Sequence, residues 1–225
     1  MNSHGRETGI DKDVVEELAK RTGYRFKTVV ESRVRIWTHL AGGTLDMSVS
    51  GIATPERERF ARFIPYFATR NYALLRRGLL PAASTAEGFL AIAEYKVAVV
   101  KSFKHGDYYD IWLNKLRAQG RVYEAADFDA VLRLLKVGRV HAILALPTSW
   151  VPALKQEALG NAVRVLDWSP KDRTVHGLIL SRERIPEVTA DRMAMAIQSM
   201  RNDGTLLTIF RRHVGSDLAS SLLDY

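Results

Sequence analysis

The sequence of 225 residues contains no cysteine, and this absence excludes two classes of site. Without cysteine the chain can build neither a disulfide framework nor a thiolate metal site. No apolar run approaches the roughly 20 residues that span a bilayer, so we expect that the chain as given is not an integral membrane protein. Residues 1–7 are polar and lack the apolar core of a signal peptide, which an exported protein would need.

Catalytic motifs are also missing. The chain has no Gly-x-Ser-x-Gly nucleophile elbow, no His-Glu-x-x-His helix and no glycine-rich phosphate loop followed by Lys-Ser/Thr. Its six histidines are scattered without the spacing of metal ligands. We therefore predict no catalytic residue, no metal and no cofactor.

What is present is the composition of an ordinary globular protein with an excess of basic residues. Hydrophobic residues make up 47% of the chain, aromatic residues make up 9%, and the formal net charge is +8. Such a charge favours anionic ligands. The densest arginine pairs, Arg76-Arg77 and Arg211-Arg212, have no aromatic platform nearby in the sequence, so we predict no nucleic-acid partner.

The most informative stretch is Asp46–Tyr66, where a strand leads into a helix start. Thr54 is a good N-cap and Pro55 suits the first helical position, so a helix is predicted to begin there. Arg57 follows within one turn, and its planar guanidinium matches a carboxylate with two parallel hydrogen bonds. Strand end, free N–H groups and guanidinium together predict an anion site. The alternative is that Arg57 is a solvated surface charge, as we expect of Arg59 and Arg62.

The same stretch resembles the signature of the bacterial family 3 extracellular solute-binding proteins, which are amino-acid-type periplasmic binding proteins. The run LAGGTLDMSVSGIATPERERFARFIPY (40–66) is similar to the family pattern in which an L-x-x-G-x-x-D-x-x-x-x-G segment precedes T-P-E-R and P-Y. Three further blocks occur in the family's order, and they are GIDKDVVEELAKRTG (9–23), LLKVGRVHAIL (134–144) and AIQSMRNDGTLLTIFRRHVG (196–215).

The resemblance implies an α/β fold with two lobes joined by two crossing hinge strands. The first lobe is expected to be discontinuous, with residues 1–76 and 177–225, and the second lobe, residues 77–176, is inserted between them. In the family, a first strand and a Pro-Pro-aromatic turn precede the block at 9–23. Neither is found here, which implies either a fragment or a first lobe with one strand fewer.

The resemblance also implies ligand-binding residues. In the first lobe these are Arg57, Thr54, Ser50 and Gly51, although the spacing between Gly51 and Thr54 is one residue shorter than the common family spacing. In the second lobe the turn after the strand Lys96–Lys101 corresponds to the family's Gly-Thr/Ser-Thr/Ser turn. Ser102 fits that pattern and Phe103 departs from it, and both are included in the predicted site.

The resemblance weakens at the position that binds the ligand ammonium. Family members that bind amino acids commonly carry an aspartate at the end of the strand after G-R-V-D-A. Here His141 replaces the first acid and Leu146 stands where the ammonium partner is expected. A buried ammonium without a counter-charge is costly. The sequence therefore favours a carboxylate ligand that lacks an amine, or an amino acid that binds weakly.

Three functions are compatible with these residues. The first is a periplasmic receptor, expected to be monomeric and not an enzyme, that captures a small polar solute for the membrane permease of an ABC importer. The second is a ligand-sensing module of a larger membrane-associated protein. The third is an enzyme similar to the cyclohexadienyl dehydratases.

Hydrophobic periodicity and turn signals predict the elements on which these residues lie. Helices are expected from Ile10 to Gly23, from Val34 with Trp37 in the core, and over 107–117, 127–137, 185–202 and 206–213. Strands are expected at 25–30, 45–52, 71–76, 96–101, 122–125, 140–146, 163–166 and after Thr174, and residues 215–225 are expected to be a polar tail.

Overall fold

The computed structural model describes residues 9–156 and 159–225, and these form two compact units. The first unit holds the described residues up to Glu31 together with Arg35–Thr69 and Val175–Tyr225, and the second holds Ser32–Val34 and Arg70–Thr174. The chain therefore passes between the units at 31/32, 34/35, 69/70 and 174/175, and the last two of these lie ahead of the lobe boundaries predicted at 76/77 and 176/177. The predicted two-lobed α/β fold is confirmed.

The second unit is built on a five-stranded sheet in the order β5-β4-β6-β3-β7. Its strands are β3 (Tyr72–Arg76), β4 (Val97–Val100), β5 (Val122–Ala125), β6 (Ala142–Ala145) and β7 (Val163–Leu166). Strand β4 pairs in parallel with β5 and β6, whereas β3 runs antiparallel to β6 and β7. The carboxyl ends of β4, β5, β6 and β7 therefore lie at one edge of the sheet.

Helices cover both faces of this sheet. Successive residues of a strand point to opposite faces, and the burial follows this period. Ala73 and Leu75 pack with Phe89 of α4 (Ala86–Ala91) and Leu113 of α5 (Asp107–Arg117), whereas Leu74 packs on the other side. The side of Leu74 is covered by α6 (Phe128–Lys136) and α7 (Pro147–Gln156). Short 3-10 turns cover Pro81–Ser84 and Leu159–Asn161.

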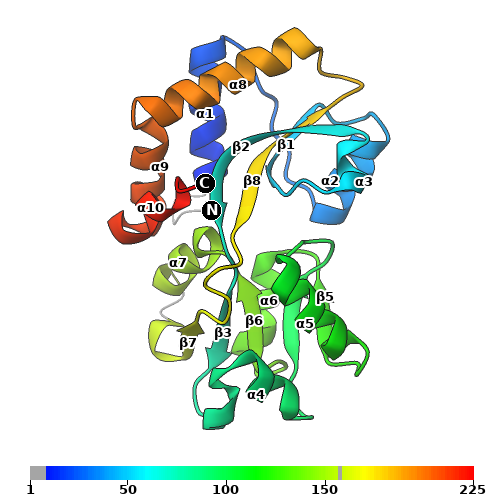
Figure 1. The fold of residues 1–225 in the computed structure, drawn as a ribbon, viewed down its shortest axis with the longest axis vertical. Helices are drawn as coiled ribbons and strands as arrows, with labels where there is room; N and C mark the ends of the chain where they lie inside the picture. The colour runs from blue at the N-terminus through cyan, green and yellow to red at the C-terminus, as the bar shows by residue number, and fades with distance from the viewer. Residues whose placement is uncertain (1–8, 157–158) are drawn as a thin grey trace. The chain divides into compact units, whose positions relative to one another are not determined.

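The first unit has a smaller sheet, which has three strands among the described residues, in the order β1-β8-β2. These are β1 (Met47–Gly51), β2 (Ala61–Thr69) and β8 (Thr174–Ser181). The helices are α1 (Ile10–Thr22), α2 (Arg33–Ala41), α3 (Pro55–Glu58), α8 (Glu187–Asn202), α9 (Thr205–Val214) and α10 (Ser216–Leu222). Helix α1 packs against α8 and α9, and α8 and α10 pack against β2 (Figure 1).

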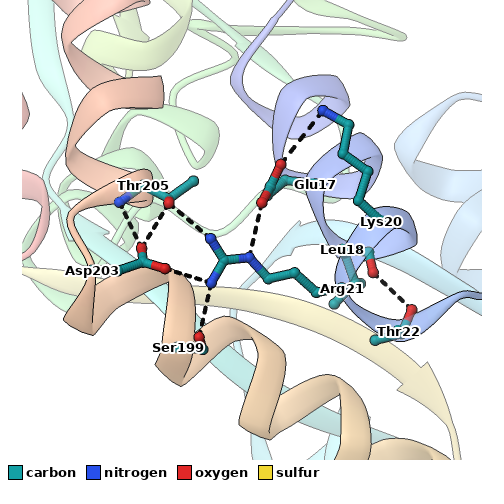
Figure 2. Close-up of polar contacts among 8 residues, drawn as sticks. All are labelled: Glu17, Leu18, Lys20, Arg21, Thr22, Ser199, Asp203 and Thr205. Atoms are coloured by element: carbon teal, nitrogen blue, oxygen red, sulfur yellow. Dashed lines mark hydrogen bonds and ion pairs between the residues drawn. The ribbon is translucent and has the colours of Figure 1, made fainter.

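Arg21, near the end of α1, joins that helix to the start of α9 (Figure 2). Its guanidinium donates hydrogen bonds to Asp203 Oδ2 at 2.7 Å, to Ser199 Oγ at 2.8 Å and to Thr205 Oγ1 at 2.8 Å. Hydrogen bonds from Arg21 and Thr205 lower the pKa of the Asp203 carboxyl to about 2. This network connects segments that are far apart in the sequence.

Two predicted elements are wrong. Arg25–Val30 was expected to be a strand, but residues 23–32 contain no regular structure, and Val29 and Val30 are 63% and 83% exposed. A strand needs a partner strand, and the alternating pattern of side chains in residues 25–30 does not provide one. The expected polar tail instead contains α10, because Ala219 and Leu222 form a buried stripe. The expected lack of a first strand concerns positions before Gly9, which lie outside the described residues.

None of the helices in the described part of the chain is long and apolar enough to cross a membrane.

Candidate functional site

The end of β1 is shaped by two unusual backbone positions, Ser50 and Gly51. Ser50 has a φ of 53°, in the left-handed region that non-glycine residues rarely adopt. A Cβ atom on Gly51 would collide with the side chain of Ile179 on β8, so only glycine lets β1 and β8 approach here. The ladder between β1 and β8 is irregular between Ser48 and Gly51. The strand therefore ends in a turn whose shape is set by these residues.

Polar contacts from α1 and β2 stabilise this strained turn. Ser50 Oγ donates to Asp11 Oδ1 at 2.7 Å, and the Tyr66 hydroxyl donates to the same oxygen at 2.6 Å. The backbone N–H of Ser50 donates to the Tyr66 hydroxyl at 2.9 Å. Tyr66 is fully buried, and its burial, together with the nearby Asp11 carboxylate, holds the pKa of its hydroxyl well above the usual range. Left-handed serine costs about 1–3 kcal/mol, which these hydrogen bonds offset.

His176 supports the same turn from β8. Its ring stacks on Phe67 with centroids 4.6 Å apart, and Nδ1 lies 3.4 Å from the carbonyl oxygen of Ser50. His176 is fully buried. Its sequence position, at the start of β8, gave no indication of this packing.

The helix predicted at Thr54-Pro55 is confirmed. Helix α3 begins at Pro55, and Thr54 Oγ1 accepts a hydrogen bond from the backbone N–H of Arg57 at 3.3 Å. The helix spans only Pro55–Glu58, so its dipole is small. The main consequence of the cap is to fix the position of the Arg57 backbone.

The Arg57 guanidinium folds back onto its own unit. Its central carbon lies 3.8 Å from the centroid of the Trp37 ring, and Nη1 donates to the carbonyl oxygen of Ile52 at 2.9 Å. Arginine stacked on an aromatic face is attracted by the ring quadrupole. Arg59, by contrast, is exposed, and its Nε donates to the carbonyl oxygen of Glu56 at 3.4 Å. The interpretation of Arg57 as a plain solvated charge therefore does not describe its surroundings.

Trp37 is the residue whose role sequence analysis missed. It was predicted to be a core residue, and it does pack with Phe60 and Phe63. The same ring also forms the platform for Arg57. No spacing rule links positions 37 and 57, because Trp37 lies on α2 and Arg57 on α3, and they meet only in the folded chain.

In the second unit, Ser102 and Phe103 follow the carboxyl end of β4. Ser102 is exposed and has a φ of 62°, and the backbone N–H of Phe103 donates to the carbonyl oxygen of Val100 at 3.2 Å. The Phe103 ring meets His105 edge-on, with centroids 5.0 Å apart. Ligands of open α/β sheets bind beyond the carboxyl ends of the strands, and these two residues lie at that edge.

Two acidic side chains at this sheet edge, Asp167 and Asp110, have basic or amide partners, although Asp167 Oδ1 is buried without a hydrogen bond. Asp167, after β7, accepts from Arg70 Nε at 2.7 Å. Asp110 accepts from the backbone N–H of His105 at 3.1 Å and lies 3.8 Å from Lys104 Nζ. Burial alone would raise the pKa of Asp110, but the contacts with His105 and Lys104 lower it overall.

The two positions that depart from the family pattern are apolar or structural. Leu146, after β6, is 6% exposed and carries no charge. His141 stacks on Tyr95 at 4.5 Å, and its Nδ1 accepts from the backbone N–H of Lys96 at 3.1 Å. Burial, followed by nearby basic groups, lowers the pKa of His141. Neither residue supplies a carboxylate at the carboxyl edge of the second sheet.

The structure thus groups the predicted residues by unit. Ser50, Gly51, Thr54 and Arg57 lie together around the end of β1 in the first unit. Ser102 and Phe103 lie together after β4 in the second unit. The role of each as a ligand contact stays a prediction.

Comparisons with known proteins agree with this architecture. The model of the bacterial extracellular solute-binding proteins, family 3, matches residues 1–216. An ancestral arginine-binding protein bound to glutamine superposes with a TM-score of 0.80 at 20% identity, over 95% of this chain and 91% of that one.

Two further solved structures are similar at low identity. A putative L-cystine ABC transporter from Listeria monocytogenes has a TM-score of 0.75 at 20% identity, over 96% of this chain and 90% of that one. An ABC uptake transporter substrate-binding protein from Streptococcus pneumoniae with bound histidine has a TM-score of 0.77 at 18% identity, over 97% and 88%. At such identity these structures show the fold alone. No curated protein matches the chain.

Proposed function

We propose that this chain, which belongs to the bacterial extracellular solute-binding proteins of family 3, captures a small carboxylate-bearing solute for an ABC importer. The proposed contacts are Ser50, Gly51, Thr54 and Arg57 from the first unit and Ser102 and Phe103 from the second. The ligand favours the state of the protein that binds it better, so its output is a shift in conformation rather than a chemical step.

The observation that carries this proposal is the fixed guanidinium of Arg57. The Thr54 cap holds its backbone, the carbonyl oxygen of Ile52 accepts from Nη1, and the Trp37 ring supports its face. A guanidinium held in one orientation loses little entropy when it binds a carboxylate through two parallel hydrogen bonds. The net charge of +8 also favours an anionic ligand.

The ligand class is narrowed by the carboxyl edge of the second sheet. Leu146 occupies the position where the family resemblance places an acid, and Asp167 and Asp110 are engaged by Arg70, His105 and Lys104. An ammonium group beside Leu146 would be desolvated without the counter-charge that the family's acid supplies at that position. We therefore propose an organic acid that lacks an α-amine.

Matched ligands test both parts of the proposal. Thermal unfolding is measured with glutarate and with L-glutamate, which differ only by the α-ammonium group, and the series extends to other dicarboxylates and amino acids. A ligand at 100 times its Kd stabilises the folded protein by about 2.7 kcal/mol. The midpoint is expected to rise with an amine-free acid and to rise less with its amino counterpart.

Two arginine variants provide the control. Arg57→Ala is expected to abolish the ligand-induced shift, whereas Arg59→Ala, at the exposed C-cap residue of the same helix, is expected to retain it. A shift that survives Arg57→Ala would contradict the site. A stronger response to amino acids than to their amine-free counterparts would contradict the ligand class but leave the site intact.

The transport role needs a partner and a compartment. We propose a membrane permease of an ABC importer as the partner, a periplasmic location and a monomeric state. The expected result is that the ligand-loaded protein stimulates the ATPase activity of the permease encoded beside it, and that light scattering gives the mass of one chain. A chain joined to a membrane helix and a kinase would instead support the sensing module.

We propose binding without turnover. Two of the solved structures named above, the ancestral arginine-binding protein and the protein from Streptococcus pneumoniae, are binding proteins by their titles. Incubation with prephenate or arogenate is therefore expected to leave both compounds unchanged, and formation of phenylpyruvate or phenylalanine would support the dehydratase alternative.

A further inference from the structure

Basic residues gather at the amino edge of the second unit's sheet, opposite the edge that carries Ser102 and Phe103. Strands β3, β6 and β4 are neighbours in this sheet. Arg76 ends β3, His141 precedes β6 and Lys96 precedes β4. Because β3 runs antiparallel to β6 while β4 runs parallel to it, these three residues lie at the same edge.

The three residues form one row across the sheet. The backbone N–H of Arg76 donates to the carbonyl oxygen of His141 at 3.0 Å, and the N–H of His141 donates to that of Lys96 at 2.8 Å. Both bonds continue the ladders of β6 by one residue. Residues that are opposite each other on neighbouring strands share a face, and such strands are about 4.8 Å apart. Arg76 and Lys96 therefore flank His141 on one face of the sheet.

A fourth basic residue, Arg139, lies two positions before His141. Its guanidinium carbon lies 5.5 Å from the centroid of the Tyr123 ring, and Lys96 Nζ lies 5.7 Å from the same centroid. A Cβ atom on Gly138 would lie 2.6 Å from Arg76 Nη1, so the Arg76 guanidinium reaches the turn that carries Arg139. These contacts bring together a group of residues that we call the amino-edge cluster: Arg76, Lys96, Arg139 and His141.

The cluster lacks a bound counter-charge. Of the ion pairs between described residues, none includes Arg76, Lys96 or Arg139. Arg76 and Arg139 are exposed, whereas Lys96 and His141 are half-buried, so the cluster is open to solvent. Like charges that are held close together repel, and an anion placed among them removes that repulsion.

His141 adds a hydrogen-bond donor to the cluster. Its Nδ1 accepts from the backbone N–H of Lys96 at 3.1 Å, so the ring proton of the neutral form is on Nε2. Burial lowers the pKa of His141, and the charges of Arg76, Lys96 and Arg121 lower it further, whereas Glu94 raises it. The imidazole is therefore neutral at pH 7 and offers an N–H group.

We propose that the amino-edge cluster binds a phosphate-bearing anion, which is either a free phosphate compound or the head group of a phospholipid. Guanidinium groups bind phosphate through two parallel hydrogen bonds, and lysine binds it as a point charge. A phosphomonoester has about −1.5 to −2 charges and three acceptor oxygens. A carboxylate has one charge and two oxygens, so three cations and an N–H donor suit phosphate better.

The test is a calorimetric titration of the full chain with pyrophosphate at constant ionic strength, with acetate as the control anion. Saturable binding of pyrophosphate is expected, together with much weaker binding of acetate. Sedimentation with vesicles compares phosphatidylglycerol mixed with phosphatidylcholine against phosphatidylcholine alone. Binding of pyrophosphate alone would support a free compound, and binding of the anionic vesicles alone would support a head group. Binding of neither would overturn the proposal.

Four variants with the same loss of charge locate the site. Arg76→Gln and Lys96→Gln are each expected to weaken binding of the phosphate probe about tenfold. Their matched controls are Arg117→Gln and Lys115→Gln, at exposed positions of α5, which covers the other face of the sheet. The controls are expected to have little effect. Equal weakening by all four variants would reduce the effect to net charge and overturn the site.

The His141 ring provides a readout that a structural role would not move. Its NMR signals, assigned with His141→Gln, are followed against pH with pyrophosphate and with sodium chloride at the same ionic strength. A nearby anion favours the imidazolium, so the pKa of His141 is expected to rise only with pyrophosphate. An unchanged pKa at saturating pyrophosphate would place the anion elsewhere and contradict the proposal.

The two proposed sites can fail independently. Arg57→Ala is expected to retain the effect of pyrophosphate on the pKa of His141, and Arg76→Gln is expected to retain the thermal shift with glutarate. Loss of the pyrophosphate effect in Arg57→Ala would show that the phosphate probe uses the first unit, and it would overturn the amino-edge site without deciding the carboxylate site.

Discussion

The sheets of the two units differ in how many of their strands are flanked on both sides. In the second unit β4, β6 and β3 each have a strand on both sides, and helices cover both faces. In the first unit only β8 is flanked on both sides within the described residues, and β1 borders a groove. The second unit is therefore expected to be the more stable of the two.

The arginines of the two units also differ. In the second unit Arg121 is 4% exposed and donates to the carbonyl oxygens of Tyr95, Leu90, Phe89 and Ile92. These hydrogen bonds fix the backbone at the end of α4 and in the loop that follows it. In the first unit Arg57 is half-buried, and the Trp37 ring and the carbonyl oxygen of Ile52 help to orient it. Arg121 stabilises the fold, and we propose that Arg57 serves ligand recognition.

The largest effect is expected from Arg121→Met, which tests whether the second unit depends on this buried charge. Several carbonyl oxygens would lose their donor inside the protein, at a cost of about 1–3 kcal/mol for each unsatisfied group. Urea unfolding of this variant is expected to show a loss of more than about 3 kcal/mol. Arg117→Met, at an exposed ion pair with Glu124, is the matched control and is expected to cost less than about 1 kcal/mol.

The next effect is expected from Tyr66→Phe in the first unit. Without the hydroxyl, Asp11 loses one donor and the strained Ser50 N–H loses its acceptor, which predicts a cost of about 1–3 kcal/mol. Urea unfolding measures the loss, and hydrogen exchange is expected to quicken around residues 49–52. Tyr24→Phe, at a residue that is not fully buried, provides the control. Equal effects of the two substitutions would show that the Ser50 turn does not need the Tyr66 hydroxyl.

A moderate effect of pH on stability is expected, and its pH range is expected to differ between the two units. Burial lowers the pKa of His105 in the second unit, so the unfolded chain binds the proton more readily. Its contribution to stability is complete above about pH 6.5 and is lost as the pH falls towards the lowered value. Asp203, in the first unit, has its pKa lowered to about 2, so its contribution is constant above about pH 4 and is lost only below that.

Tryptophan fluorescence can report this difference. The chain has four tryptophans, and Trp37→Phe leaves three, at 112, 150 and 168, all in the second unit. In that background the urea midpoint is expected to fall between pH 7.5 and pH 5.0, and to fall less in His105→Gln. Asp203→Asn is expected to alter the pH dependence only in the acid range. A midpoint that rises on acidification would contradict the assigned direction for His105.

The smallest effect is expected from Arg21→Met. This network is partly exposed, and exposed ion pairs contribute little. The expected fall in the thermal midpoint is less than about 4 °C, reduced further by 1 M salt, which shortens the screening length. A loss as large as that of Arg121→Met would show that the junction of α1 with α9 controls the stability of the first unit.

Much of the fold follows from patterns that are local. The helix at Pro55, the helix over 107–117 and the strands at 122–125 and 163–166 were predicted correctly, because caps and periodicity lie within a few residues. The strand at 25–30 failed because pairing is a property of two segments. The helix at 216–222 was missed because its buried stripe has only two members.

The site was predictable only in part, for the same reason. Thr54 and Arg57 are neighbours in sequence, and their hydrogen bond was implied by the cap. The ring of Trp37 and the shared oxygen of Asp11 reach the turn from other elements, so only the folded structure reveals them. Arginine and serine could be located from the motif, whereas the groups that orient them could not.

The discontinuous first unit has a consequence for synthesis on the ribosome. The segment 70–174 is contiguous, and its sheet can close as soon as β7 has emerged. β1 and β2 must wait much longer, because their common neighbour β8 is translated only after the whole of that segment. Throughout this interval the nascent chain carries two strands without their central partner, and a chaperone that shields extended apolar segments would find its substrate there.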